Sequence, residues 1–442
     1  MGEAFLYGNG GSNKPNVKLT ITTQAGATVR ITKTDDPSRS YIKTANSEGY
    51  AIFKNLISGE YEIYINDGEY ARTEYVNVIS EYTENINLYR IYGISRDITL
   101  SSTEWAREGD AVGKSAVATI GTVAGYSDFD SCYPWSGIER VTLDTGDVMV
   151  KIPKFWYKRF MDGTIDNIMI ADRPVDGFTL HPAFNHAGVE ADYVYVGAYE
   201  TSSTHTSSTG ISPKTNISLN TFRTNAQAKG SGWGVIDIST VSAIQMLILV
   251  EFANNNVQNI IGFGYTIKNT SALKTGSCDN IANLTGAPSN NSGGKYGVVW
   301  RGIENLWGNT SCFVDGIISS DRQYYVCNDP SKYTGSSLTD YNSTGVTVAT
   351  NIDSKIITKI YYNESNSSTN YLMVPIEASG GSNTTYYCDT CVMQSGLKIP
   401  AYGGTWASGT SAGLFYLYFN QSSTSTGSNL GSRLIYIPKE VQ

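Results

Sequence analysis

The sequence predicts an α+β protein, in which an N-terminal β-sandwich precedes a larger domain with two main helices, short strands and long loops. Short alternating runs such as VKLTITT and EYEIYIND, separated by turn residues, fill residues 14–90 and are typical of a small antiparallel sandwich. Two segments with helical spacing follow at 218–230 and 239–256. After residue 257 the chain returns to short strands and Gly/Asn/Ser-rich loops, an order of elements that favours an α+β domain.

The composition is that of a folded chain with a polar but weakly charged surface. Of the 442 residues only 16% are charged, against a usual value of about 25%, whereas 12% are aromatic and 31 are tyrosines. Disordered chains combine few aromatics with high charge, so this composition excludes a disordered chain. The net charge of −8 leaves no basic excess to displace counterions from nucleic acid, and we expect no nucleic-acid partner.

The apolar segments do not predict a membrane location. The first residues, MGEAFLYGNGG, lack the basic start and the apolar core of a secretory signal, so we expect synthesis in a cytoplasm. The longest apolar run, AIQMLILVEFA at 243–253, contains Gln245 and Glu251 and is too short to span a bilayer. We therefore expect no membrane insertion.

Changes in composition place the boundaries between segments. We expect a flexible N-terminus at 1–13, the β-sandwich at 14–90, a β-rich connecting region at 91–165, and the larger domain at 166–442. In the larger domain, Ser218 is the expected N-cap of the first helix and Ser239 that of the second. The second helix repeats apolar residues at helical spacing, which indicates core packing.

The residue types that usually supply catalysis form no recognisable constellation. His181 and His186 lie in HPAFNH, where a proline favours an extended segment over a helical ligand pair, and His205 lies in a Ser/Thr loop. Asp128 and Asp130 alternate as cation ligands can, but they lack EF-hand spacing and are expected to be solvated. GxSxG, Walker A and dinucleotide-binding motifs are absent from the sequence. We predict no catalytic residue, no metal site and no cofactor.

The cysteines give a weak signal. Of the six, only Cys388 and Cys391 are closely spaced, in CDTC, and a single pair does not supply the four ligands of a structural zinc site. Free structural thiols are the favoured interpretation, and a disulfide or a metal or redox role are the alternatives.

The end of the chain combines a linker-like composition with aromatic residues. Residues 403–433 read GGTWASGTSAGLFYLYFNQSSTSTGSNLGSR. Residues 413–420 alternate as in a β-strand, which predicts an inward face of Phe415, Leu417 and Phe419 and an outward face of Leu414, Tyr416, Tyr418 and Asn420. Tyr among Ser, Thr, Gly and Asn is typical of antibody-like binding surfaces. By composition alone, a binding surface and an ordinary Tyr-rich edge strand are equal alternatives.

The N-terminal segment resembles a known class of module. GATVRI, TANSEGYAIFKNLISGEYEIYI and INL, in this order, resemble the carboxypeptidase-regulatory and PEGA-like Ig-type modules. The resemblance implies an Ig-like β-sandwich that serves as a spacer or docking unit.

Several stretches of the rest of the chain together resemble bacteriophage tail and host-recognition proteins. They are IYGISRDITLSS (91–102), SDFDSCYPWSGIERVTL (127–143), VMVKIPKFWYKR (148–159), GFTLHPAFNHAGVEADYVYVGAYE (177–200), TVSAIQMLILVEFANNNVQNIIGFGYT (240–266) and WRGIENLWGN (300–309). Residues 403–433 resemble the variable region of diversity-generating-retroelement target proteins: GG-x-W, then an AG(L/V)F strand, then a polar run that ends in N-(I/L)-G-(F/S)-R. The resemblance implies a C-type-lectin fold of the formylglycine-generating-enzyme type.

The same resemblance implies which residues form the frame of the site and which vary. The frame would be Gly403, Gly404, Trp406, Gly413, Phe415, Asn429, Gly431 and Arg433, with Trp300, Glu304, Asn305 and Trp307 from a preceding motif. That motif departs from the family's GN-x-W-E-W order, which leaves a structural calcium ion there in doubt. The ligand-binding, variable-type positions would be Thr405, Ala407, Ser408, Thr410, Ser411, Leu414, Tyr416, Tyr418, Asn420, Ser422 and Thr424.

The resemblance implies a receptor-binding protein, or adhesin, of a phage or prophage. It would be assembled in the host cytoplasm, sit in the virion at a tail tip or tail fibre as a homotrimer beside other tail proteins, and bind a bacterial surface protein or glycan. The protein sequence does not show whether a retroelement diversifies this region, because the codons that such an element changes are not visible in it.

Two other hypotheses compete with receptor binding. One is a tail-associated enzyme, either of the formylglycine-generating type or a depolymerase. The former needs a cysteine pair just before its closing Arg, and Ser422–Arg433 has none; the latter needs paired carboxylates, and Asp128, Asp130 and Glu304 lack convincing partners. The other hypothesis is a purely structural virion protein.

Overall fold

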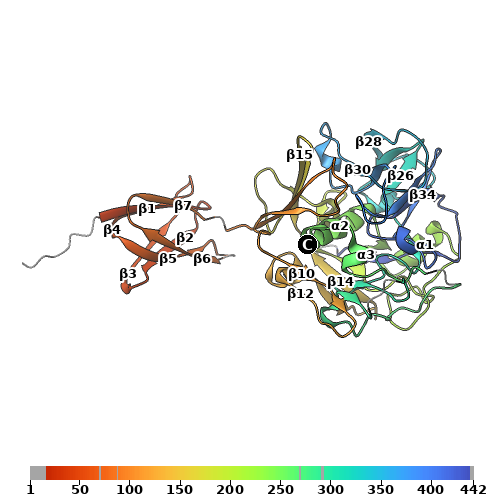
Figure 1. Ribbon diagram of the computed structural model, residues 1–442, viewed down its shortest axis with the longest axis horizontal. Coiled ribbons are helices and arrows are strands. Elements are labelled where there is room, and N and C mark those ends of the chain that lie inside the picture. Colours follow the sequence, from red (N-terminus) through yellow and green to blue (C-terminus); the bar gives the residue numbers. More distant parts are fainter. Residues whose placement is uncertain (1–15, 69–70, 87, 268–269, 290–292, 439–442) are drawn as a thin grey trace, which may run out of the picture. The chain divides into compact units, whose positions relative to one another are not determined.

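The structure is a computed structural model that describes residues 16–68, 71–86, 88–267, 270–289 and 293–438 (Figure 1). The chain divides into two units, Met1–Arg90 and Ile91–Gln442. The predicted flexible segment 1–13 lies outside the described residues.

The first unit packs two sheets around one apolar core. Their orders are β4-β1-β7 and β3-β2-β5-β6. The strands are β1 (Asn16–Thr22), β2 (Thr28–Lys33), β3 (Asp36–Thr44), β4 (Tyr50–Ile57), β5 (Gly59–Asn66), β6 (Ala71–Val78) and β7 (Tyr82–Asn85). Alternation turns one side of each sheet inward, so that Leu19 of β1, Phe53 of β4, and Ile31 and Ile63 of the other sheet join one buried cluster. The short runs seen in the sequence thus build a two-sheet sandwich.

The regular structure of the chain is mostly β, and the prediction of an α+β fold with two main helices is wrong. Of the described residues of the chain, 40% lie in strands and 12% in helices. The two segments with helical spacing do form helices, α1 (Leu219–Gln227) and α2 (Ile238–Phe252), and a short α3 (Val257–Ile260) follows. Many strands of this unit are only two to five residues long, too short to produce a clear alternating signal, so the sequence understates the β content.

Three of the sheets of the larger unit have five or six strands. The first is β17 (Thr179–Leu180), β15 (Trp156–Asp162), β16 (Ile165–Ala171), β8 (Ile91–Asp97) and β9 (Ala106–Gly109). The second is β13 (Glu139–Thr142), β14 (Val148–Pro153), β20 (Tyr193–Gly197), β36 (Leu434–Tyr436) and β21 (Trp233–Val235). The third is β29 (Ile352–Ile356), β32 (Thr390–Met393), β34 (Leu417–Gln421), β33 (Ile399–Tyr402), β25 (Ser311–Phe313) and β35 (Leu430–Gly431).

Smaller sheets complete the larger unit. One joins β11 (Thr119–Ile120), β22 (Gly286–Ala287), β23 (Val299–Trp300) and β24 (Ile303–Glu304), and another joins β26 (Ile317–Ser320), β27 (Gln323–Val326) and β28 (Asn342–Thr347). The two-stranded pairs are β10 (Ala116–Val117) with β12 (Tyr126–Ser127), β18 (Asn185–His186) with β19 (Val189–Glu190), and β30 (Lys359–Ile360) with β31 (Pro375–Glu377).

Helix α2 lies inside the unit with strands around it (Figure 1). Every one of its residues is buried, which agrees with core packing. Its N-cap is Asp237 and not the predicted Ser239. The backbone of Asp237 is extended, and its carboxylate accepts the Thr240 N–H at 2.8 Å. For α1 the predicted cap is confirmed: the Ser218 hydroxyl accepts the Thr221 N–H.

None of the helices in the described part of the chain combines the length and the apolar character needed to cross a membrane.

Candidate functional site

The terminal region begins with two glycines in a backbone conformation that other residues rarely adopt. Gly403 and Gly404 have φ values of 86° and 82° and are buried. A Cβ atom on Gly403 would lie 2.6 Å from the Leu306 carbonyl oxygen, and one on Gly404 would lie 2.7 Å from the Ala412 Cβ. These glycines let the chain pass close to the preceding motif and then turn.

A buried carboxyl group fixes the start of the aromatic segment. Asp389 accepts the Phe415 N–H at 2.7 Å, and burial raises the pKa of this carboxyl well above its usual value. Gly413 passes directly over it, so that a Cβ atom there would lie 2.0 Å from Asp389 Oδ1. The glycine therefore permits the contact that holds Phe415.

We expect Gly413→Ala to lower the free energy of unfolding of the protein by about 1–3 kcal/mol, because the added methyl group overpacks against Asp389. Gly293→Ala is the matched control, since its Cβ meets nothing nearer than 4.0 Å. Urea denaturation measures the free energy of unfolding of both variants. Equal stability of the two variants would show that Asp389 can move away at no cost.

The closing arginine ties the terminal region to two other sheets. Arg433 is 1% exposed; its Nη1 donates to the Gly197 carbonyl at 2.7 Å, and its Nη2 donates to the carbonyls of Glu304 and Asn305. One side chain thus holds the ends of β20 and β24 against the chain that leads into β36. This is a frame role, since no part of the guanidinium is offered to solvent.

The other predicted frame residues are buried too, apart from Asn429, which is exposed. The indole N–H of Trp300 donates to Glu251 and that of Trp307 donates to the Gly262 carbonyl, each at 2.9 Å. Trp406 is 7% exposed, and its backbone N–H donates to Asn309.

The carboxyl group of Glu304 forms hydrogen bonds with backbone N–H groups. Its two carboxyl oxygens accept the N–H groups of Gly276 and Cys278 at 3.0 and 2.9 Å, and burial raises its pKa to about 7. No group of three or more His, Cys, Asp or Glu side chains in the described ranges is placed to hold a metal ion. The absence of a cofactor stays a prediction, and the alternative of a structural calcium ion stays untested.

The raised pKa of Glu304 predicts a pH dependence of stability. The fold favours the protonated carboxyl, so this stabilisation is full below the unfolded pKa, near 4.5, and is lost as the pH rises through about 7. We expect the contribution of Glu304 to fall by about 1–3 kcal/mol over this window. Urea unfolding at pH 4.5 and pH 7.5 measures how much the free energy of unfolding changes between the two pH values. This change should be smaller for Glu304→Gln than for the parent protein or for the exposed-site control Glu377→Gln. An unchanged difference in Glu304→Gln would contradict the assignment.

A pair of tyrosines forms the centre of the candidate surface. The rings of Tyr416 and Tyr418 stack with centroids 4.0 Å apart and planes 18° from parallel. The Tyr418 hydroxyl forms hydrogen bonds with Ser354 Oγ at 2.7 Å and Thr390 Oγ1 at 3.0 Å. Burial, with Tyr418 beside it, raises the pKa of Tyr416, so its phenol stays protonated. Both rings are held in place before any ligand arrives.

The outward face predicted for 413–420 is only partly correct. Strand β34 begins at Leu417, and within it Leu417 and Phe419 are buried whereas Tyr418 and Asn420 are partly exposed, as predicted. Leu414 and Tyr416 are 0% and 5% exposed, so their outward assignment is wrong. The chain turns before the strand because the Leu414 carbonyl accepts the Gln245 side-chain N–H of α2 at 2.8 Å.

The remaining predicted binding residues divide by exposure. Ala407, Thr410, Ser422 and Thr424 are exposed, Ser408 and Ser411 are partly exposed, and Thr405 is buried at 7% exposure, which contradicts a ligand-contacting role for Thr405. Its hydroxyl instead accepts the Ala407 N–H inside the turn.

The predicted residues come from two turns at different places. The turn at 405–411 lies beside the tyrosine pair: burial raises the pKa of Tyr416, and Ser408 is one of the neighbouring side chains that oppose this rise. The turn at 422–426 follows the far end of β34, on the order of 13 Å along the strand from Tyr418. We therefore define the tyrosine surface as Ser354, Ala407, Ser408, Thr410 and Tyr418, with the buried Tyr416 stacked against Tyr418 as its support. Ser422 and Thr424 border it at a distance.

Sequence reasoning missed Ser354 and Thr390. They lie on β29 and β32, which reach β34 only through the order of the six-stranded sheet. Ser354 is exposed with φ 44°, between the exposed Asp353 and Lys355. A serine in a polar strand carries no signal that would have revealed this contact.

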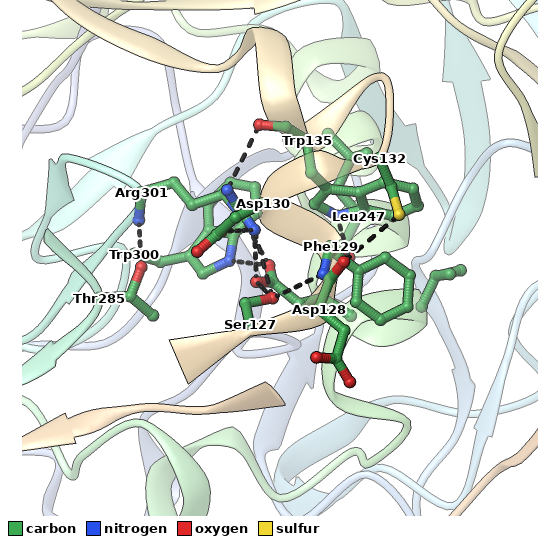
Figure 2. A network of polar contacts seen from close by, with 12 residues as sticks. Ser127, Asp128, Phe129, Asp130, Cys132, Trp135, Leu247, Thr285, Trp300 and Arg301 are labelled. Carbon is green, nitrogen blue, oxygen red and sulfur yellow. Dashed lines mark hydrogen bonds and ion pairs between the residues drawn. The ribbon is translucent and has the colours of Figure 1, made fainter. Parts of the chain in front are cut away.

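Asp128 and Asp130, the candidate ligands of a cation and candidate carboxylates of glycan hydrolysis, each bind a different partner. Asp130 pairs with Arg301 Nη2 at 2.8 Å, as Figure 2 shows, and the same guanidinium pairs with Glu251 at 2.7 Å. Asp128 accepts the N–H of Ser115 at 2.7 Å, and the hydrogen bonds from Ser115 lower its pKa. The two carboxylates therefore do not converge on one site.

The histidines and cysteines are placed as follows. His181 is buried among aromatic rings, and burial lowers its pKa to about 3; His186 contacts Asp237; and His205 contacts Asn225. All six cysteines are buried free thiols. Cys388 and Cys391 thus form no disulfide in this structure.

Comparison with known proteins gives no family assignment. No family model matches the chain, and no curated protein matches it. A solved structure of the Major Tropism Determinant U1 variant is 11% identical, covers 92% of this chain and 94% of its own, and has a TM-score of 0.25. A structure from Bacteroides ovatus described as a putative adhesin is 7% identical, covers 41% of this chain and 77% of its own, and has a TM-score of 0.14. At these TM-scores neither likeness carries a conclusion about the fold.

Proposed function

We propose that the chain is a receptor-binding protein of a bacteriophage or prophage that binds a bacterial surface protein or glycan through the tyrosine surface. The observation that carries the proposal is the stacked pair of Tyr416 and Tyr418, with the outer phenol held by Ser354 and Thr390. The proposal includes no catalytic step and no cofactor.

The physical argument is preorganisation. Tyrosine offers a large amphipathic contact area at a low cost in conformational entropy, and a ring that is already stacked and hydrogen-bonded loses little further freedom on binding. The small hydroxyl-bearing side chains around it, Ser354, Ser408 and Thr410, can donate to or accept from either an amide or a sugar hydroxyl.

Diversification by a retroelement is the finer part of the proposal. The exposed side chains of Ala407, Thr410, Ser422 and Thr424 lie on turns, outside the buried frame, so exchanges there alter the surface and spare the core. The encoding DNA tests this: we expect AAY-type codons across 405–426 in a template repeat next to a reverse transcriptase gene. Without such a repeat the chain would be an adhesin of fixed sequence.

We also propose that the protein sits at the tail of a virion as a homotrimer, since several copies raise avidity without any new contact. The proposal rests on the tyrosine surface and the sequence motifs. The names of the two structural neighbours agree with it but add no weight at their TM-scores.

Binding of the fluorescently labelled protein to a panel of bacterial strains tests the function. We expect saturable binding to some strains, competed by unlabelled protein and lost after removal of the matching surface protein or glycan. Absence of saturable binding to every strain that its phage or prophage host range includes would overturn the proposal.

A further inference from the structure

The larger unit contains a cavity of about 820 Å³ that shares no residue with the tyrosine surface. Its size lies within the range of about 300–1,000 Å³ that is typical of ligand pockets. The walls come from β18 and β19, α1, the segment Gly230–Val235, residues 329–331, and the end of β36. Apolar side chains, among them Val189, Ile435 and Ile437, form much of this lining.

One wall of the cavity is the unpaired edge of a sheet. Strand β21 is the last strand of its sheet and pairs only with β36 there. Ile437 N–H donates to Gly232, and Ile236 N–H donates to Arg433, so the even-numbered residues of β21 face β36. The main-chain groups of Trp233 and Val235 therefore point away from β36. Trp233 N–H donates to the Gly230 carbonyl, and among the described residues the Trp233 carbonyl and the Val235 N–H have no main-chain partner, so both can pair with another strand.

A buried histidine on the same cavity lacks one partner. His186 is 6% exposed at its side chain, and its Nε2 lies 2.9 Å from Asp237 Oδ2. Burial alone would raise the pKa of Asp237, but hydrogen bonds, that from His186 first, lower it to about 2, so the carboxylate is ionised and Nε2 donates. The other ring nitrogen, Nδ1, has no hydrogen-bond partner within the described part of the chain. A buried polar atom of this kind calls for a hydrogen-bond partner.

The charges of the cavity disfavour an anionic ligand. Arg223 is its cationic side chain, and Asp315 binds it through both Nε, at 2.8 Å, and Nη2. Asp329 lines the cavity, and the ionised Asp237 lies behind His186. A free carboxylate, such as the end of a peptide, would meet these negative charges without a free cation in the lining, whereas an uncharged amide group would not.

We propose that this cavity binds an internal, extended and apolar peptide segment of a partner protein, which adds a strand to the edge of β21. The segment's carbonyl accepts from Val235 N–H, one of its N–H groups donates to the Trp233 carbonyl, and a further main-chain group of the segment hydrogen-bonds to His186 Nδ1. Its apolar side chains pack against Val189, Ile435 and Ile437. This mode, strand addition with side-chain pockets, combines affinity from the main chain with selection by the side chains.

The probe is a fluorescein-labelled peptide of alternating valine and threonine, five residues long and blocked at both ends. Titration into the full-length protein by fluorescence polarisation should give saturable binding. A peptide of the same sequence with N-methylated amides should bind at least ten-fold more weakly, because it cannot donate to the Trp233 carbonyl. Hydrogen exchange should slow at the Val235 amide on binding of the unmodified peptide. No saturable binding, equal binding of the methylated peptide, or an unprotected Val235 amide would each overturn the proposal.

A matched pair of surface variants locates the site. Val189 is 57% exposed on the cavity lining, and Val123 is 73% exposed elsewhere on the same unit. We expect Val189→Glu to weaken peptide binding at least ten-fold and Val123→Glu to leave it unchanged. Equal effects of the two exchanges would place the peptide outside the cavity and overturn the proposal. If only a second copy of the chain, and no peptide, occupied the cavity, the site would serve self-association instead. Binding to bacterial cells should be the same in both variants, so this test is independent of the tyrosine surface.

Discussion

Tyr418→Ala is expected to weaken binding of the protein to bacterial cells by at least roughly thirty-fold while the fold is kept. Tyr418 carries the exposed half of the stacked pair and reaches Ser354 and Thr390, so its removal takes away the ring and leaves Tyr416 uncovered. Tyrosines at the centre of an interface typically cost at least about 2 kcal/mol when truncated. That corresponds to a loss of affinity of roughly thirty-fold, measurable as the Kd for cells or for the isolated receptor.

Two controls separate the contribution of the ring from other effects. Tyr418→Phe keeps the stack and loses only the hydroxyl, so we expect a loss of roughly five-fold, equivalent to about 1 kcal/mol for its hydrogen bonds. Tyr75→Ala makes the same large exchange at a tyrosine that is 60% exposed in the first unit, and should bind as the parent does. If Tyr418→Ala bound cells with unchanged affinity, the site would have to be placed elsewhere. Circular dichroism and urea unfolding confirm that the variant is folded.

Arg433→Met should produce the largest loss of stability among the variants considered. The exchange leaves the carbonyls of Gly197, Glu304 and Asn305 buried without their charged donor. Breaking such a buried, charge-assisted network typically costs about 3–5 kcal/mol. We expect a corresponding drop in the free energy of unfolding of the larger unit in urea, followed by loss of binding, because the chain that leads from the tyrosine surface is no longer held.

Arg433→Lys tests whether the planar fork or the charge matters. A lysine keeps the charge but cannot reach three carbonyls in the same geometry, so an intermediate loss is expected. Arg39→Met, at an exposed arginine of the first unit, is the matched control and should leave unfolding of the larger unit unchanged. A parent-like unfolding midpoint for Arg433→Met would show that the three carbonyls find other donors, and the frame role of Arg433 would be wrong.

The candidate site could be predicted from the sequence in its frame but only partly in its surface. Gly413 and Arg433 are buried at close contacts, as expected for frame residues. The surface prediction treated 413–420 as one strand, although the strand begins at Leu417 and the residues before it are buried. Alternation reports which residues share a face only while the backbone is extended, and the turn before β34 is caused by contacts with Gln245 and Asp389, far away in the sequence.

The fold shows the same division at the level of elements. The N-cap of α1, the helical spacing of α2 and the alternation in the first unit are local properties, and the structure contains them. The N-cap of α2 is Asp237 and not Ser239: its carboxylate accepts the Thr240 N–H and also contacts His186, a residue of another strand. The α+β prediction failed because short strands assembled into many small sheets give almost no periodic signal in the sequence.

By itself the sequence determined the turns and the apolar faces of the strands of the first unit, and that the last segment joins aromatic residues to small polar ones. Only the tertiary structure decided that Tyr416 is covered by Tyr418, that Ser354 and Thr390 hold the outer phenol, and that Asp128 and Asp130 have separate partners. The reason is physical: burial and hydrogen bonding depend on neighbours brought together by sheet order, and neither residue type nor spacing records which strands will lie side by side.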